Sequence, residues 1–185
     1  MARFAYTAPP QDWMNRWGED YAQALPYFEE AVQRTPRYAE AWFKVGVCNG
    51  ELGRWHEAVT AYQQAIRFQP DFAEAHSNLG TAYRNLERPW EAVAAYQQAI
   101  RFKPDLAEAH YNLGPAYGHL GHWQEAVAAL QQAIHLKPND AEAHLNLGAA
   151  YLILGDRDSA LEEYKILKTL DQNLANDLFG FLFYR

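Results

Sequence analysis

A repeat of 34 residues constrains the fold of this chain more than any other feature of its 185 residues. The segment Glu57–His76 aligns with Glu91–His110 and differs from it at only three positions. The segment Glu125–His144 follows the same pattern with more differences. A period of this length is typical of small supersecondary units that stack and bury a continuous core against their neighbours. The repeat therefore predicts an elongated array and argues against an enzyme domain built around one core.

Each period contains two helical patterns. Apolar residues at three- and four-residue spacing run through Ala73–Leu86 and Glu91–Phe102, which are rich in residues that favour helices. Between the two patterns of three units stand Gly53, Gly121 and Gly155. Glycine often occupies the position where a helix ends with a positive φ and the chain reverses. Each period is therefore predicted to form a helix–turn–helix unit.

Prolines close the second helical pattern of each unit, because proline cannot continue a helix. Directly after each proline an Asp or Asn precedes a glutamate by three residues, which is the spacing of a capping box. These pairs are therefore expected to begin the next helix, with the acidic or amide residue as the N-cap. In contrast, Pro89 is expected at the start of its own helix. The prolines and pairs are Pro70 with Asp71 and Glu74, Pro104 with Asp105 and Glu108, and Pro138 with Asn139 and Glu142.

The residues that recur at this period resemble those of the tetratricopeptide repeat. The motif Leu79-Gly80-x-x-Tyr83 recurs from Leu113 and from Leu147, and Trp42 heads the first full unit. Alanine columns and the closing prolines complete the pattern. The resemblance implies an all-α fold, a right-handed superhelical solenoid of antiparallel helix hairpins. Small residues in such an array let paired helices approach closely, and aromatic columns fill the space between neighbouring pairs.

The register of the motif divides the chain into consecutive units of one continuous domain. A degenerate N-terminal unit or cap occupies residues 1–38, and its first helix is expected near Gln11–Trp17. The fourth full unit is divergent, because Leu167 replaces an alanine and Gln172 stands where a proline is expected. Atypical ends are expected where a solenoid must cover its open apolar faces. The full units are 39–72, 73–106, 107–140 and 141–174, followed by a capping segment at 175–185.

Composition and charge limit the possible partners. The net charge is −7 and no basic stripe is present, so nucleic acid and anionic membranes are not expected as partners. No apolar run reaches the roughly 18 residues that a membrane span needs, so no membrane insertion is expected and the cytoplasm is the default location. The single Cys48 cannot form an internal disulfide and is expected to be a small buried apolar residue.

The sequence lacks catalytic and metal-binding motifs. It has no Gly-rich phosphate loop, nucleophile elbow or His-Glu-x-x-His, so no enzyme activity and no cofactor are expected. His76, His110 and His144 recur with the repeat, and their spacing of about 8–10 Å is too large for one zinc ion. His119 and His122 straddle a turn, but no third ligand is evident. No metal site is expected.

A column of asparagines is the periodic feature that packing does not require. Asn78, Asn112 and Asn146 each precede the Leu-Gly pair, and Lys44 stands at the equivalent place. Asparagine is a mediocre helix former, whereas its amide can both donate to and accept from a peptide backbone. The column resembles that of the repeat domain of O-linked N-acetylglucosamine transferase, which implies a concave groove that binds an extended peptide or a partner helix. The alternative is that the column is only inherited consensus.

The same geometry implies which further side chains face the groove. The groove is expected to change from polar near its start to apolar near Leu145–Ile153, where a ligand would place an apolar side chain. A carboxylate clamp, which some relatives use to grip acidic C-termini, is not expected because Asn112 and Glu108 stand where cations are needed. The expected groove residues are Phe43, Lys44, Ser77, Asn78, Arg84, Asn85, Tyr111, Asn112, His119, Leu145, Asn146, Leu152 and Ile153.

Two local features leave alternatives open. Pro115 lies inside a first helix, which costs about 3 kcal/mol or more; a tolerated kink is favoured over a reshaped pocket. The segment Leu178–Tyr184 is dense in apolar residues and is expected to cap the last unit. Alternatively, it is exposed and makes the chain a homo-oligomer. The function expected is therefore a protein-interaction adaptor or scaffold. The alternatives are a self-assembling scaffold and the substrate-recruiting region of a larger transferase.

Overall fold

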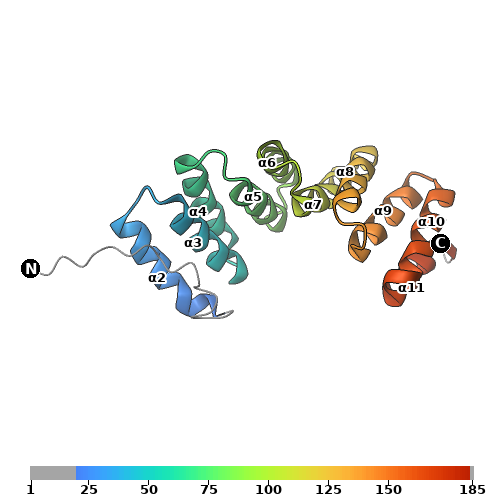
Figure 1. The fold of residues 1–185 in the computed structure, drawn as a ribbon, viewed down its shortest axis with the longest axis horizontal. Helices are drawn as coiled ribbons and strands as arrows, with labels where there is room; N and C mark the ends of the chain where they lie inside the picture. The colour runs from blue at the N-terminus through green and yellow to red at the C-terminus, as the bar shows by residue number, and fades with distance from the viewer. Residues whose placement is uncertain (1–19, 184–185) are drawn as a thin grey trace, which may run out of the picture.

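The computed structural model describes residues 20–183, which form ten α-helices and no β-strand (Figure 1). The helix expected near Gln11–Trp17 lies outside the described residues. The helices follow one another along an elongated array, with the first at one end and the last at the other. Their bounds are α2 Tyr21–Arg34, α3 Ala39–Glu51, α4 Trp55–Phe68, α5 Ala73–Asn85, α6 Pro89–Phe102, α7 Ala107–His119, α8 Trp123–Leu136, α9 Ala141–Ile153, α10 Arg157–Leu170 and α11 Gln172–Phe183.

The helices pair into hairpins that stack in chain order. We call α3, α5, α7 and α9 the first helices and α4, α6, α8 and α10 the second helices of the four full units. Each first helix packs on the second helix of its own unit, and those after α3 also pack on the second helix of the preceding unit. First helices also contact the next first helix, whereas within residues 20–183 no two second helices of neighbouring units touch. The first helices therefore line the inner, concave side, and the predicted all-α tetratricopeptide-repeat solenoid is confirmed.

The turn inside each hairpin has the left-handed backbone that the glycines predicted. Gly53, Gly121 and Gly155 have φ values of 72°, 76° and 81°. The second full unit has Glu87 at the same place, and its φ is 57°. A residue with a Cβ meets a steric penalty there that glycine avoids. The reversal is thus a property of the repeat, and the second unit makes it without glycine.

The turn between units differs from the predicted capping boxes. Phe72 N–H donates to the carbonyl of Gln69 at 3.2 Å, which places Pro70 and Asp71 at the centre of a β-turn. The helix begins at Ala73, as its apolar pattern predicted, but its N-cap is Phe72 and not Asp71, and Phe72 makes no side-chain hydrogen bond. The same holds for Leu106. The capping-box prediction for the aspartates and Asn139 was wrong, because proline draws the next residue into the turn. In the fourth unit the N-cap is Asp140, which accepts from Ala143 N–H.

The Trp/His column closes this turn. Trp42 Nε1 donates to the carbonyl of Pro36 at 2.8 Å. At the same position in later units the Nε2 atoms of His76, His110 and His144 lie 2.9, 3.0 and 2.9 Å from the carbonyls of the preceding closing prolines. A carbonyl can only accept, so each Nε2 must carry a proton. The recurrence of these histidines therefore has a structural cause, the anchoring of a ring to the turn before it.

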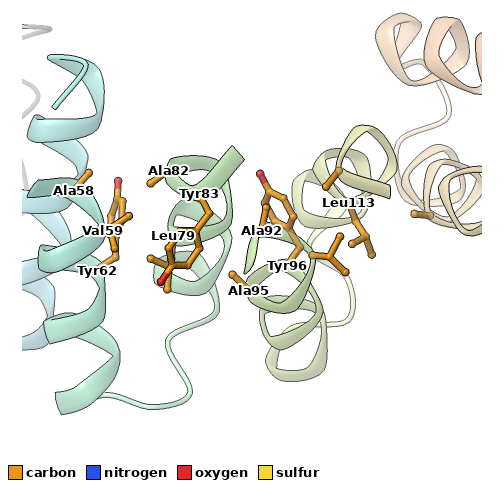
Figure 2. Close-up of a cluster of buried hydrophobic side chains, with 13 residues drawn as sticks. Ala58, Val59, Tyr62, Leu79, Ala82, Tyr83, Ala92, Ala95, Tyr96 and Leu113 are labelled. Carbon is orange, nitrogen blue, oxygen red and sulfur yellow. The ribbon is translucent and has the colours of Figure 1, made fainter. Parts of the chain in front are cut away.

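The packing inside each hairpin rests on close approach at one glycine column. A Cβ built on Gly80 would lie 2.7 Å from Tyr96 Cε1, and one on Gly46 would lie 2.5 Å from Tyr62 Cε1. Tyr62 and Tyr96 are buried among alanines of the surrounding helices (Figure 2). Burial of these rings removes large apolar areas from water, at about 25 cal/mol per Å². The small-residue and aromatic columns therefore act together, as the resemblance implied.

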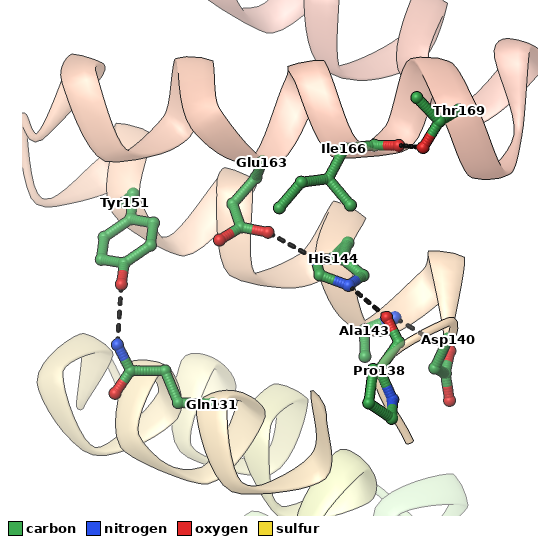
Figure 3. Close-up of polar contacts among 9 residues, drawn as sticks. All are labelled: Gln131, Pro138, Asp140, Ala143, His144, Tyr151, Glu163, Ile166 and Thr169. Atoms are coloured by element: carbon green, nitrogen blue, oxygen red, sulfur yellow. Dashed lines mark hydrogen bonds and ion pairs between the residues drawn. The ribbon is translucent and has the colours of Figure 1, made fainter. Parts of the chain in front are cut away.

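Hydrogen bonds join neighbouring units at a second recurring position. The amides of Gln63, Gln97 and Gln131 donate to the hydroxyls of Tyr83, Tyr117 and Tyr151, at 3.0, 2.8 and 2.8 Å. Each bond runs from a second helix to the first helix of the next unit, and the last of them is visible in Figure 3. The glutamine and the tyrosine both recur with the repeat, so the same bond forms between successive units. These bonds help to hold a constant angle between units.

The C-terminal end departs from this regular packing. In the first three units the glycine column meets Tyr62, Tyr96 or Leu130 of the second helix, whereas Gly148 meets Leu178 of α11. The helix α11 packs against both α9 and α10, and Leu178 is fully buried. It thus covers the apolar side of the last hairpin. In the same hairpin Glu163 stands where earlier units have a buried alanine, and its Oε2 lies 2.5 Å from Nδ1 of His144 (Figure 3).

Candidate functional site

The asparagine column lies on the first helices, but its amides are not free. Asn78 lies beside the hydroxyl of Tyr62 and lowers its pKa, although burial raises that pKa by more. Asn112 is only 7% exposed, and its Oδ1 accepts from Arg84 Nη1 at 3.3 Å. The amide nitrogen of Asn146 donates to the hydroxyl of Tyr111, also at 3.3 Å. Asn112 is therefore the floor of the groove, whereas Asn78 and Asn146 are half-buried at its surface.

Tyr111 links the last two first helices. Its hydroxyl donates to Oε2 of Glu142 at 2.9 Å, while it accepts from Asn146. Burial, followed by the hydrogen bond to the Glu142 carboxylate, raises the pKa of Tyr111 to about 12. The hydroxyl therefore stays protonated near neutral pH and keeps Glu142 as its acceptor. This network joins α7 to α9 across the concave side.

The cations of the groove are also engaged. Lys44 Nζ lies 3.3 Å from Glu40 on its own helix, and Arg84 reaches Asn112. Lys103, on the following turn, pairs with Glu74 at 2.8 Å, and that hydrogen bond is the main cause of the lowered pKa of the Glu74 carboxyl. Lys44 and Arg84 lie on successive first helices and do not converge with a third cation from α7.

The other residues of the predicted site differ in exposure. Phe43 packs on Tyr62 and on Phe72, with ring centroids 5.9 and 4.8 Å apart. Ser77 is 2% exposed, and within residues 20–183 its Oγ has no hydrogen-bond partner. Leu145 packs on the apolar cluster of α10 and α11. His119 is exposed at the end of α7. The structure therefore distributes these residues over several helices instead of gathering them at one point.

Two pockets open between first helices. The acidic pocket, of about 400 Å³, lies between α3, α5 and α7. The apolar pocket, of about 220 Å³, lies between α7, α8 and α9. Sequence reasoning found some of the residues around them but not the pockets themselves. The acidic pocket is lined by Val47, Gly50, Glu51, Gly53, Trp55, Tyr62, Asn78, Thr81 and Glu108. The apolar pocket is lined by Gly114, Pro115, Gly118, His119, Trp123, Ala126, Leu130, Asn146, Ala149, Ala150 and Ile153.

A glycine and a tryptophan form the base of each pocket. A Cβ on Gly50 would lie 3.5 Å from Trp55, and one on Gly118 would lie 2.9 Å from Trp123. The signal was present in the sequence as a glycine five residues before a tryptophan in the first and third full units. In the second unit Arg84 stands at the glycine position. Its longer side chain occupies the space between the two pockets and bonds Asn112.

Pro115 lies within the continuous helix α7 and lines the apolar pocket. Its ring adds apolar surface on the concave side, at the position held by Val47 in the first unit and Thr81 in the second. A tolerated kink and a reshaped pocket were the two interpretations of this proline. Both expect it to face the groove, and in the structure it lines the apolar pocket.

A third pocket, the terminal pocket, lies at the C-terminal end of the array. It measures about 520 Å³ and is lined by Ala149, Leu152, Ile153, Gly155, Arg157 and Phe181. Ile153 is 55% exposed and Phe181 is 47% exposed. Apolar side chains are therefore exposed at this end of the array, and the change from polar to apolar along the groove stays a prediction.

Other site chemistry is limited in the described part of the chain. Among residues 20–183 no group of three or more His, Cys, Asp or Glu could hold a metal ion. His122 instead stacks on Tyr117 and meets the edge of Trp90. Burial raises the pKa of the Cys48 thiol to about 11, as expected of a small apolar residue. None of the helices from α2 to α11 has both the length and the apolar character that crossing a bilayer requires.

Comparisons with solved structures identify the same architecture in other proteins. MamA superposes with a TM-score of 0.82 at 25% identity, covering 92% of this chain and 99% of that one. YrrB, described as a TPR protein with an unusual peptide-binding site, superposes with a TM-score of 0.77 at 23% identity, covering 91% and 88%. A thermophilic TPR protein from Thermus thermophilus, TTC0263, gives a TM-score of 0.68 at 25% identity and covers 92% and 94%.

No curated protein matches the chain. The particular likeness of its repeats to O-linked N-acetylglucosamine transferase stays a prediction from the motif. A family model described as the Cilia and flagella-associated protein 70 C-terminal domain matches residues 14–176. This match covers most of the 185 residues and includes all four full units. The chain therefore belongs to this family of tetratricopeptide-repeat proteins.

Proposed function

We propose that the chain is a protein-interaction scaffold that binds an extended peptide segment along its concave groove. One observation carries the proposal: two pockets, one lined by Asn78 and the other by Asn146, open beside first helices that contact one another. The likeness to YrrB, described as a TPR protein with an unusual peptide-binding site, supports the same use of this architecture. Arrays of this kind present extended concave surfaces suited to binding other proteins.

The asparagines would act by exchanging weak internal contacts for contacts with a peptide backbone. The bonds of Asn112 to Arg84 and of Asn146 to Tyr111 are both 3.3 Å long, at the far end of the normal range. An extended backbone presents alternating donors and acceptors that an amide can match. Each such bond contributes about 0.5–1.5 kcal/mol net.

The test begins with peptides selected from a random phage-displayed library on the intact chain. Their affinity is then measured by fluorescence anisotropy for the wild type and for the Asn78→Ala/Asn112→Ala/Asn146→Ala variant. Loss of up to three backbone hydrogen bonds is expected to weaken binding by about tenfold or more. The Asn146→Ala variant alone, which removes a single 3.3 Å contact, is expected to weaken binding less.

The matched control removes three amides from the second helices, with the changes Gln64→Ala, Gln98→Ala and Gln132→Ala at the same 34-residue spacing. It is expected to bind within about twofold of the wild type, a difference of under about 0.5 kcal/mol. Circular dichroism must report equal helix content for every variant. Equal affinity of the wild type and the asparagine variant would refute binding along the groove.

Self-assembly is the second candidate function. It is favoured by the exposed apolar side chains of Ile153 and Phe181 around the terminal pocket. Sedimentation velocity over a range of concentrations tests it, with Phe181→Ser as the variant. A mass that rises with concentration in the wild type, and not in the variant, would support self-assembly. A constant monomer mass would exclude it over that range of concentrations.

A further inference from the structure

The acidic and apolar pockets are the same structural site, built twice with different chemistry. Residues of one pocket map onto those of the other by a shift of two repeats. Gly50 corresponds to Gly118, Trp55 to Trp123 and Asn78 to Asn146, and all six line their pockets. The other residues that line the two pockets differ in charge and polarity. The inference drawn from this pairing rests on the proposed function, since it concerns the peptide that the groove would bind.

The acidic pocket has two carboxylates without an ion-pair partner. Glu51 and Glu108 are exposed, and within residues 20–183 neither forms an ion pair. The equivalents of Glu108 in the other units all have partners. Glu40 and Glu74 pair with lysines, and Glu142 accepts from Tyr111. Glu108 is thus the exception in its column, and it lies where a cationic side chain entering the pocket would meet it.

The polar groups at the base of the acidic pocket would also suit a cationic side chain. Tyr62 and Asn78 both line this pocket, and burial raises the pKa of Tyr62 more than Asn78 lowers it. Tyr62 therefore stays neutral and adds a hydroxyl to the pocket that holds Glu51. The neighbouring cation Arg84 is bonded to Asn112 and makes no ion pair with Glu108.

In the apolar pocket hydrocarbon side chains take the places of Tyr62 and Thr81, and His119 stands at that of Glu51. Leu130 stands at the place of Tyr62, Pro115 at that of Val47, and Ala149 at that of Thr81. Ile153, at the mouth, is 55% exposed. An aliphatic side chain that covered this surface would remove apolar area from water at about 25 cal/mol per Å². The pocket has one titratable group at its rim, His119.

The separation of the two pockets sets the spacing of the side chains that can reach them. Two steps between packed first helices amount to about 16–20 Å, at 8–10 Å each. An extended chain advances about 3.3 Å per residue, which gives about five or six residues. A separation of about six also returns the side chain to the same side, because it is a multiple of two for a strand and of three for polyproline II. The Arg84–Asn112 bridge lies between the two anchor points.

We propose that the groove binds an extended peptide through two of its side chains, which lie about six residues apart. A lysine or arginine enters the acidic pocket, and an aliphatic side chain enters the apolar pocket. The charge complementarity comes from Glu51 and Glu108, and the chain as a whole has a net charge of −7. The basic residue can come before or after the aliphatic residue, depending on the direction in which the peptide binds. The experiment therefore examines both orders.

The experiment selects peptides from the random library on three forms of the full chain. These are the wild type, the Glu51→Gln/Glu108→Gln variant and the Glu29→Gln/Glu57→Gln control. The control removes two exposed carboxylates that lie outside the pockets. The wild type and the control are expected to enrich a basic and an aliphatic residue about six apart. The pocket variant is expected to lose the preference for the basic residue.

Affinity measurements separate the two anchors. A peptide selected on the wild type is expected to bind about tenfold more weakly to Glu51→Gln/Glu108→Gln, and the difference should shrink at high salt. Ile153→Ser is expected to weaken binding about fivefold or more, without changing the salt dependence. A charge-reversed chain, Glu51→Lys/Glu108→Lys, is expected to prefer the same peptide with glutamate in place of the basic residue.

The outcomes distinguish this inference from the proposed function. Peptides that bind in an asparagine-dependent way, but show no basic or aliphatic preference, would overturn the two-anchor inference and leave groove binding intact. Failure to select any peptide that depends on the asparagines would overturn both. Self-association that blocks the binding of these peptides would assign the groove to a second copy of the chain and would also overturn the inference.

Discussion

At the scale of single residues, the glycines of the Leu-Gly pairs determine how closely the helices of a hairpin approach. A Cβ on Gly80 would lie 2.7 Å from the Tyr96 ring, and one on Gly114 would lie 2.6 Å from Leu130. Real Cβ atoms do not come this close to another heavy atom, so an added methyl group must displace the ring or the helix. Gly180 in α11 is different, because its added Cβ would meet nothing within 4 Å.

Gly80→Ala is expected to lower the free energy of unfolding by about 1–3 kcal/mol, because overpacking forces the ring and the helices apart. Gly180→Ala is the matched change at an open position, where the higher helix propensity of alanine is expected to stabilise the fold by about 0.5–1 kcal/mol. Urea denaturation followed by circular dichroism measures both. Effects of the same sign would contradict the role given to the Gly80 contact.

At the scale of the helices, one ion pair distinguishes the last hairpin from the others. His144 lies between the carbonyl of Pro138 and the carboxylate of Glu163, at 2.9 and 2.5 Å. Earlier units have Ala61, Ala95 and Ala129 at the place of Glu163. This contact therefore joins α9 to α10 in the unit where Leu178 of α11, and not a side chain of the second helix, packs on the glycine of the Leu-Gly pair.

Glu163→Ala is expected to destabilise the C-terminal hairpin by about 1–3 kcal/mol, because a largely buried hydrogen bond to a charged group is lost. Glu162→Ala, next to it, removes only an exposed carboxylate that pairs with Lys165. That change is expected to alter stability by less than about 0.5 kcal/mol. Hydrogen exchange of α9 and α10 measures the difference. Equal protection of these helices in the two variants would show that the pair contributes nothing.

At the scale of the whole molecule, the core is a series of local clusters along the array. One cluster joins α2, α3 and α4, a second extends from α3 to α8, and a third joins α9, α10 and α11. In such an array stability is approximately the sum of terms from each unit and its nearest neighbours. The helix α11 adds Leu178 and Leu182 to the third cluster, so its contribution should remain local.

Leu178→Ala is expected to cost about 2–5 kcal/mol, because it removes a fully buried side chain that packs on Gly148. The loss of hydrogen-exchange protection is expected in α9–α11, with α3 and α4 little changed. Phe181→Ala, on the exposed side of the same helix, is expected to change protection much less. Uniform loss of protection along the chain would contradict nearest-neighbour stability.

Several elements could be predicted from the sequence because their causes are local. The 34-residue period, the two helices of each unit and the positive φ of Gly53, Gly121 and Gly155 all follow from spacing and residue type. The capping-box prediction failed for a local reason too, since Pro70 draws Asp71 into a β-turn. The inner position of the asparagine column came from the resemblance to the family, not from spacing.

Which side chains of different units meet depends on how the units pack against one another. The resemblance to the family implied that Asn112 faces the groove, whereas packing between units buries it and pairs it with Arg84. The pairing of His144 with Glu163 and the two pockets likewise depend on how neighbouring helices cross. The repeating unit and its stacking follow from the amino-acid sequence, because helix propensity and hydrophobic period are local properties. The groove chemistry depends on distances between helices, which no spacing along the chain specifies.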